Sequence, residues 1–164
     1  MINENGKRIS IKGLIDEDFV NYKKTSMTIM FPRCSFKCGF ELCQNYALDR
    51  ESDIQITLSS LYERYASNPI SHAIVLQGLE PMDSWDDVLL LLEYFRFEKQ
   101  CQDDIVIYTG YTENEISDKI EAIKLCFHNV VIKFGRYVPN QQPHYDEVLG
   151  VKLASDNQYA KKIS

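Results

Sequence analysis

Four short apolar runs recur along this chain, and each is followed by a turn that contains glycine or proline. They occupy residues 27–31, 73–76, 105–108 and 130–132. Neighbouring positions in each run are apolar, rather than every second one, which is typical of strands buried on both faces. The pattern therefore predicts four interior strands of one sheet.

Helical spacing fills the intervals between these strands. Thr57 can cap a helix that runs to about residue 67. Ser84 with Asp87, and Thr112 with Glu115, have the spacing of capping boxes. Each pair stands ahead of apolar residues that recur every three or four positions, so each is expected to begin a helix.

The alternation of strand, turn and helix predicts an α/β fold with a mainly parallel sheet covered by helices. Two weaker patterns predict an edge strand or ordered arm at 8–12 and a fifth strand at 148–151. The polar stretch 139–143, which begins and ends with proline, predicts a surface loop.

The length of 164 residues and the 45% hydrophobic content suit one domain with its own core. We expect a single domain over 1–164, with 1–15 as an N-terminal arm or edge strand. The chain is shorter than a complete eight-unit β/α barrel requires. An incomplete, open parallel barrel is therefore the predicted architecture.

The acidic balance of the chain narrows its partners. A formal net charge of −6 argues against nucleic-acid binding, which needs a basic face. No apolar run approaches the roughly 18 residues of a membrane span, and the polar start lacks the apolar core of a secretory signal. We expect a cytoplasmic protein with neither a nucleic-acid nor a membrane partner.

The five cysteines are unevenly placed. Cys34, Cys38 and Cys43 fall within ten positions, whereas Cys101 and Cys126 lie far downstream. An odd, clustered set is a poor layout for a disulfide framework, so reduced thiols are expected. We interpret the two distant cysteines as packed or half-exposed thiols.

The clustered cysteines follow the first predicted strand, in a stretch that Pro32 and Gly39 keep from regular periodicity. Ligands bind at the carboxyl ends of parallel strands. Three thiolates can hold three irons of a cubic [4Fe-4S] cluster and leave the fourth iron open. A zinc site would normally want four ligands, and the three histidines of the chain are distant in sequence. Spacing alone leaves both interpretations open.

Two stretches together resemble the radical S-adenosylmethionine superfamily. The first is the cysteine loop with Gln and Asn directly after Cys43, although four residues separate Cys38 from Cys43 where the superfamily usually has two. The second is Gly-Leu-Glu-Pro at 78–81, which is similar to the superfamily's Gly-Gly-Glu-Pro turn, with Leu79 in place of the second glycine.

A finer resemblance is to the activating enzymes of anaerobic ribonucleotide reductases. It rests on Asp-Phe-Val-Asn at 18–21, Tyr-Thr-Gly-Tyr at 108–111 and Leu-Ala-Ser-Asp-Asn-Gln at 153–158. Lys133 stands where that family typically has an aspartate.

The resemblance implies a partial parallel β/α barrel of the radical SAM type that carries a [4Fe-4S] cluster and S-adenosylmethionine. It implies cluster-based chemistry, in which the cleaved cofactor yields a 5′-deoxyadenosyl radical that takes a hydrogen from a glycine of the partner. The ligands it implies are Cys34, Cys38 and Cys43. The cofactor-binding residues it implies are Gly78, Leu79 and Glu80 at the methionine end, Thr109 and Asn157 near the nucleoside, and Lys133 at the ribose or carboxylate.

The partners that the resemblance implies are a large glycyl-radical reductase subunit and an electron donor such as a flavodoxin or ferredoxin. A small-molecule substrate, as in the deazaguanine-forming relatives with unusual cluster loops, is an alternative within the same superfamily. A zinc-stabilised binding module that is not an enzyme is the alternative outside it.

Overall fold

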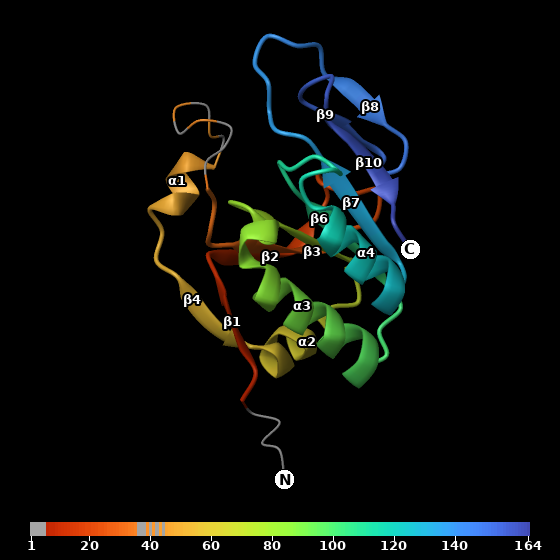
Figure 1. Cartoon of the computed structure of the whole chain (residues 1–164). Coiled ribbons are helices and arrows are strands. Elements are labelled where there is room, and N and C mark those ends of the chain that lie inside the picture. The colour runs from red at the N-terminus through yellow and green to blue at the C-terminus, as the bar shows by residue number, and fades with distance from the viewer. Residues whose placement is uncertain (1–5, 36–38, 40, 42, 44) are drawn as a thin grey trace.

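The computed structural model of the chain describes residues 6–35, 39, 41, 43 and 45–164 (Figure 1). Its centre is a six-stranded sheet in the order β10-β7-β6-β5-β3-β2. The inner strands β3, β5, β6 and β7 are parallel, and the edge strands β2 and β10 run antiparallel to their neighbours. The strands span β2 Gly13–Asp18, β3 Ser26–Phe31, β5 Ala73–Gly78, β6 Asp104–Tyr108, β7 Val130–Phe134 and β10 Tyr159–Lys162.

The four parallel strands lie side by side in the order in which they occur along the chain. When successive right-handed crossovers all move the same way across a sheet, their helices lie on one side of it. The three main helices therefore cover the same face (Figure 1). These helices are α2 Leu58–Ala66, α3 Trp85–Glu93 and α4 Ser117–Cys126.

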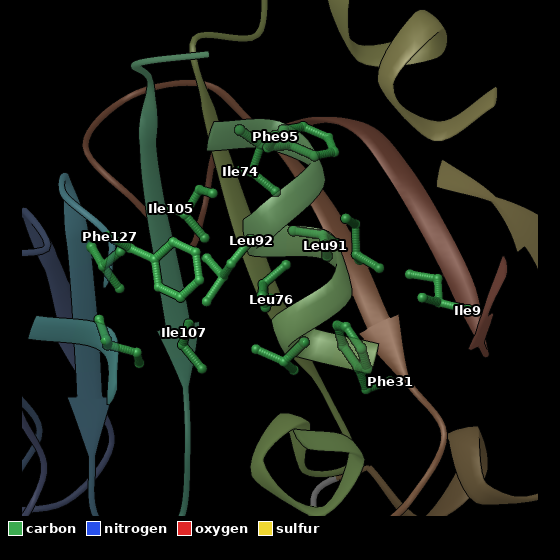
Figure 2. Packing of buried hydrophobic residues seen from close by; sticks show 14 of the residues in the cluster. Ile9, Phe31, Ile74, Leu76, Leu91, Leu92, Phe95, Ile105, Ile107 and Phe127 are labelled. Atoms are coloured by element: carbon green, nitrogen blue, oxygen red, sulfur yellow. The ribbon is translucent and has the colours of Figure 1, made fainter. Parts of the chain in front are cut away.

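The main hydrophobic core lies between this face and the helices. Alternate strand residues, such as Leu76 and Ile107, pack with Leu91 and Leu92 of α3 (Figure 2). The same cluster contains the fully buried ring of Phe95, just after α3. Burial of each large apolar side chain contributes about 1.5–3 kcal/mol, so this face provides most of the fold's stability.

The opposite face of the sheet is covered by chain segments rather than by helices. Its small apolar residues Val75, Val106 and Val131 pack against Tyr22, from the β2–β3 connection, and against apolar residues of the C-terminal segment. The latter include Leu149, Leu153 and Ala160. A hairpin of β8 His144–Asp146 and β9 Val151–Leu153 lies in that segment.

The remaining elements are short. Strand β1 Arg8–Ile11 pairs antiparallel with β4 Ile54–Thr57, and Ile9 and Ile11 enter the main core. The other elements are α1 Tyr46–Asp49, the 3₁₀ turn η2 Pro81–Ser84 and the π-helical η3 Tyr94–Glu98, which continues α3. No helix in the described part of the chain is long and apolar enough to cross a membrane.

The α/β class, the four interior strands and the helix after Thr57 are confirmed. The Thr57 hydroxyl accepts from the Ser60 N–H, as a cap does. Thr112 and Glu115 exchange hydrogen bonds as a capping box, one turn before α4 begins. Over the described residues the sheet is open and does not close into a barrel, since β2 and β10 are its edges.

The helix predicted to begin at Ser84 is confirmed as α3, but its predicted capping bond and the predicted fifth strand were wrong. Ser84 makes no capping bond, because the 3₁₀ turn begins the segment earlier and the Glu80 side chain accepts from the Met82 N–H there. Residues 148–150 form a turn rather than part of a fifth strand, since the Leu149 N–H bonds to the Asp146 carboxylate. The strand that extends the sheet is β10, whose exposed Lys161 and Lys162 are typical of an edge.

Candidate functional site

A cavity of about 410 Å³ opens at the carboxyl ends of the parallel strands. Its volume lies within the range of small-molecule sites, which is roughly 300–1,000 Å³. Three polar side chains form its floor. They are Gln77, Tyr108 and Lys133.

The floor residues form one row across β5, β6 and β7. Tyr108 pairs with Lys133, and Gln77 follows the pair of Leu76 with Ile107. Side chains alternate between the faces of a strand, so this row points away from the helices. The sheet register therefore brings together three polar groups that are more than 20 residues apart in sequence.

The cysteine loop forms one wall of the same cavity. Cys34 and Cys43 are both half-buried and both line it. Cys38, the middle cysteine, lies outside the described residues. Within the described residues, no three histidine, cysteine or acidic side chains are grouped to hold a metal. The structure thus brings two of the three predicted ligands to the cavity.

Two hydrogen bonds join the cysteine loop to the turn after β5. The Asn45 amide donates to the Gly78 carbonyl at 2.7 Å, two residues after Cys43. The Ser35 N–H donates to the Asp83 carboxylate at 2.7 Å, one residue after Cys34. One end of the loop is therefore held by the Gly-Leu-Glu-Pro turn, and the other by the 3₁₀ turn η2 that continues it.

Gly78 occupies a position that only glycine can fill without strain. Its φ is +105°, and a Cβ there would lie 2.5 Å from the Phe31 nitrogen and 2.8 Å from the Met30 Cα. The next N–H, of Leu79, donates to the Phe31 carbonyl at 3.1 Å. The turn is thus pressed onto the end of β3, where the cysteine loop begins.

The Glu80 side chain is buried and engaged within the protein. Its carboxylate accepts from the Met82 N–H at 3.0 Å, the Thr109 hydroxyl at 2.8 Å and the Gly110 N–H at 2.8 Å. Burial raises the pKa of Glu80, and these three hydrogen bonds partly offset that effect. Glu80 and Thr109, both predicted to bind cofactor, therefore fasten the turn after β5 to the turn after β6.

Lys133 brings a buried cation to the cavity floor. Its ammonium donates to the Gly135 carbonyl at 2.8 Å and lies 5.8 Å from the centre of the Tyr108 ring. Burial lowers the pKa of Lys133 to about 8, although the Glu80 carboxylate counteracts the shift. An ammonium has three donors, so this group suits an anionic ligand.

Asn157 is exposed and is not among the described residues that line the cavity. Its amide donates to the Arg136 carbonyl at 2.7 Å and its oxygen accepts from the Ser155 hydroxyl. The neighbouring Gln158 is the residue that lines the cavity, and its amide donates to the Gly135 carbonyl. The predicted segment therefore reaches the cavity through Gln158, and cofactor binding by Asn157 stays a prediction.

Sequence reasoning missed Tyr111 and Arg136, which also line the cavity. The Arg136 guanidinium lies 5.4 Å from the centre of the Tyr111 ring and forms an ion pair with Glu115 at 2.9 Å. Both follow directly after strand ends, and that position was the available signal. Lys152, from β9, is exposed and lines the cavity as well.

The donors on this wall suit an iron–sulfur cluster, because cysteine thiolates are its usual ligands. Comparison with curated proteins and with solved structures finds no match. A family model described as a 4Fe-4S single cluster domain matches residues 21–159, which include the cysteine loop and every strand from β3 to β9. The chain therefore belongs to the family of 4Fe-4S single cluster domains.

Proposed function

We propose that this iron–sulfur protein is a radical S-adenosylmethionine enzyme with the partial β/α barrel of that superfamily. The observation that carries the proposal is the attachment of the cysteine loop to Gly78 and to Asp83, on either side of Glu80, beside a cavity of about 410 Å³. A structural cluster would need no adjoining ligand cavity. Here the two motifs that resemble the superfamily share a wall.

Cys34, Cys38 and Cys43 would hold the cluster, and no fourth cysteine lies in the loop. A bound [4Fe-4S] cluster with three protein ligands supplies one electron and an open iron site, which suits reductive cleavage of S-adenosylmethionine to methionine and a 5′-deoxyadenosyl radical.

The chain's own residues would bind and orient the cofactor. The turn of Gly78 and Leu79 offers backbone groups to the methionine ammonium, and the buried ammonium of Lys133 offers donors to the methionine carboxylate. Glu80 and Thr109 line the same cavity and, through the hydrogen bond between them, keep these parts in register. The C-terminal segment closes the far wall and excludes water from the radical.

The proposed substrate is a glycine in a large glycyl-radical reductase subunit. The radical would take one hydrogen atom from the glycine Cα, which leaves 5′-deoxyadenosine and a glycyl radical. The order of the motifs at 18–21, 108–111 and 153–158 supports this choice. A flavodoxin or ferredoxin would supply the electron.

A small anionic molecule is the second candidate substrate. The cavity is lined by Lys133, Arg136 and Lys152 against the single carboxylate of Glu80 among the described lining residues. The chain as a whole has a net charge of −6, and a peptide glycine would need no such concentration of cations. Anaerobic co-purification with a large reductase subunit, followed by detection of its glycyl radical, distinguishes the two.

Anaerobic reconstitution with iron and sulfide tests the enzyme itself. We expect about four irons per chain and, with dithionite, release of methionine and 5′-deoxyadenosine from S-adenosylmethionine. Serine variants of Cys34, Cys38 and Cys43 should each lose the cluster absorbance. Cys126→Ser is the matched control, because Cys126 is exposed on α4 and should leave the cluster unchanged.

The outcomes separate the candidates. Zinc without iron in protein isolated anaerobically would support the zinc-stabilised binding module. It would contradict both the iron–sulfur cluster and the proposed enzyme activity. A loaded cluster that leaves S-adenosylmethionine intact would overturn the enzyme alone.

A further inference from the structure

Asp83 is the point where three separate segments meet at the start of the cysteine loop. One carboxylate oxygen accepts from the Ser35 N–H at 2.7 Å, and the other accepts from the Tyr111 hydroxyl at 2.5 Å. The Tyr111 hydroxyl also lies 3.3 Å from the Ser35 hydroxyl. Cys34 directly precedes Ser35, so these contacts act on the backbone that carries a cluster ligand.

Tyr111 is itself fixed from the other side. Arg136 lies over its ring, and Glu115, the ion-pair partner of Arg136, also accepts from the Thr112 N–H that precedes α4. Burial and the neighbouring Asp83 carboxylate raise the pKa of Tyr111, so its hydroxyl stays a neutral donor. These contacts therefore link the turn before α4 to the cysteine loop.

We propose that Asp83 and Tyr111 are positioning residues for the cluster: together they hold the Cys34 end of the loop at the cavity wall and set the charge and hydrogen bonding beside it. The inference rests on the cysteine loop holding the cluster and does not depend on cleavage of S-adenosylmethionine.

The two residues act on the cluster through different physical terms. Asp83 brings a negative charge and ties up the Ser35 N–H, and both effects favour the oxidised cluster, whose potential responds to nearby charge and to hydrogen bonds on its sulfurs. Tyr111 partly neutralises that charge by donating to it. Removing Asp83 and removing Tyr111 should therefore shift the reduction potential in opposite directions.

The first measurement uses the cluster-free full chain. Alkylation of Cys34 by iodoacetamide, followed by peptide mass spectrometry, should be about fivefold faster in both Asp83→Asn and Tyr111→Phe, the factor to which one lost hydrogen bond corresponds. The exposed Cys126 provides the internal reference for reagent activity. Asp86→Asn is the matched control, because Asp86 is an exposed carboxylate three residues away.

The second measurement is a potentiometric titration of the reconstituted cluster. We expect a more positive midpoint potential in Asp83→Asn, a more negative one in Tyr111→Phe, and no shift in Asp86→Asn. A purely structural contribution would move both variants in the same direction. Unchanged Cys34 alkylation in both variants, or potentials that shift alike, would overturn the proposal whether or not the enzyme cleaves S-adenosylmethionine.

Discussion

At the scale of single residues, Gly78 shows how little space separates the two strands beneath the site. A methyl group there would meet the backbone of Met30 and Phe31, which cannot move aside as a side chain can. We expect Gly78→Ala to lower the free energy of unfolding by about 1–3 kcal/mol through overpacking and a strained φ. Urea denaturation of the cluster-free chain measures this loss.

Gly13→Ala is the matched control for that substitution. Its added methyl group would lie 2.9 Å from the Met30 Cε, which is the flexible end of a side chain. The control should therefore change stability much less. Equal losses in the two variants would show that the close approach of β3 and β5 is not what requires glycine at position 78.

Lys133 gives the stability a defined dependence on pH. Its pKa is about 8 in the folded protein against an ordinary value of 10.5, so between these values the unfolded chain binds more protons. Stability should therefore rise with pH from about 8 toward 10.5, by at most on the order of 3 kcal/mol. Below pH 8 both states hold the proton and this slope disappears.

Unfolding in urea at several pH values, for the wild type and for Lys133→Met, isolates this contribution. The variant should lack the rise, and tyrosines that ionise above pH 10 affect both proteins alike. Lys152→Met removes an exposed lysine from the same cavity and should keep the rise. A parallel pH dependence in wild type and Lys133→Met would contradict the assignment to this ammonium.

At the scale of elements, η3 depends on one buried arginine. Arg96 donates to four backbone carbonyls that lie in the connections before β6 and β7, namely those of Cys101, Asp103, His128 and Asn129. Arg96→Met would leave these carbonyls without their donor, and we expect a loss of about 2–4 kcal/mol in the free energy of unfolding. Thermal and urea denaturation both report it.

Arg64→Met is the comparison for that variant. Arg64 bonds to Asp16 through two nitrogens, but both side chains are largely exposed. Exposed ion pairs contribute up to about 1 kcal/mol, so the loss should be clearly smaller. A loss as large as that of Arg96→Met would mean that the four carbonyl contacts of Arg96 stabilise the fold no more than an exposed ion pair does.

The elements themselves were largely predictable, because apolar runs and Thr57 are local signals. The 3₁₀ turn η2 before α3 was not predictable, since its cap is the side chain of Glu80, which the family resemblance assigned to cofactor binding. Strand β10 was missed because an edge strand with Lys161 and Lys162 has no continuous apolar run.

At the scale of the whole molecule, the position of the site was predictable but the part played by each residue was not. Parallel strands share one carboxyl edge, so the sequence could predict that the cysteine loop, the turn at 78–81 and Lys133 meet there. Whether a polar side chain faces a ligand or another segment depends on contacts between distant segments. Glu80 and Thr109 line the cavity and also bond to each other, Asn157 bonds to the Arg136 carbonyl, and cofactor binding by all three stays a prediction.

The uninterrupted strand order has a consequence for how substitutions in this protein act. One face of the sheet carries the helix-covered core, and the other carries the cavity floor, so consecutive residues of a strand serve separate purposes. Leu76 and Ile132 maintain folding, whereas their immediate neighbours Gln77 and Lys133 face the ligand space. Near the end of each strand, the residue that packs in the core and the next one, which faces the cavity, therefore meet separate requirements. Substitutions at the cavity can change its chemistry while the core stays the same.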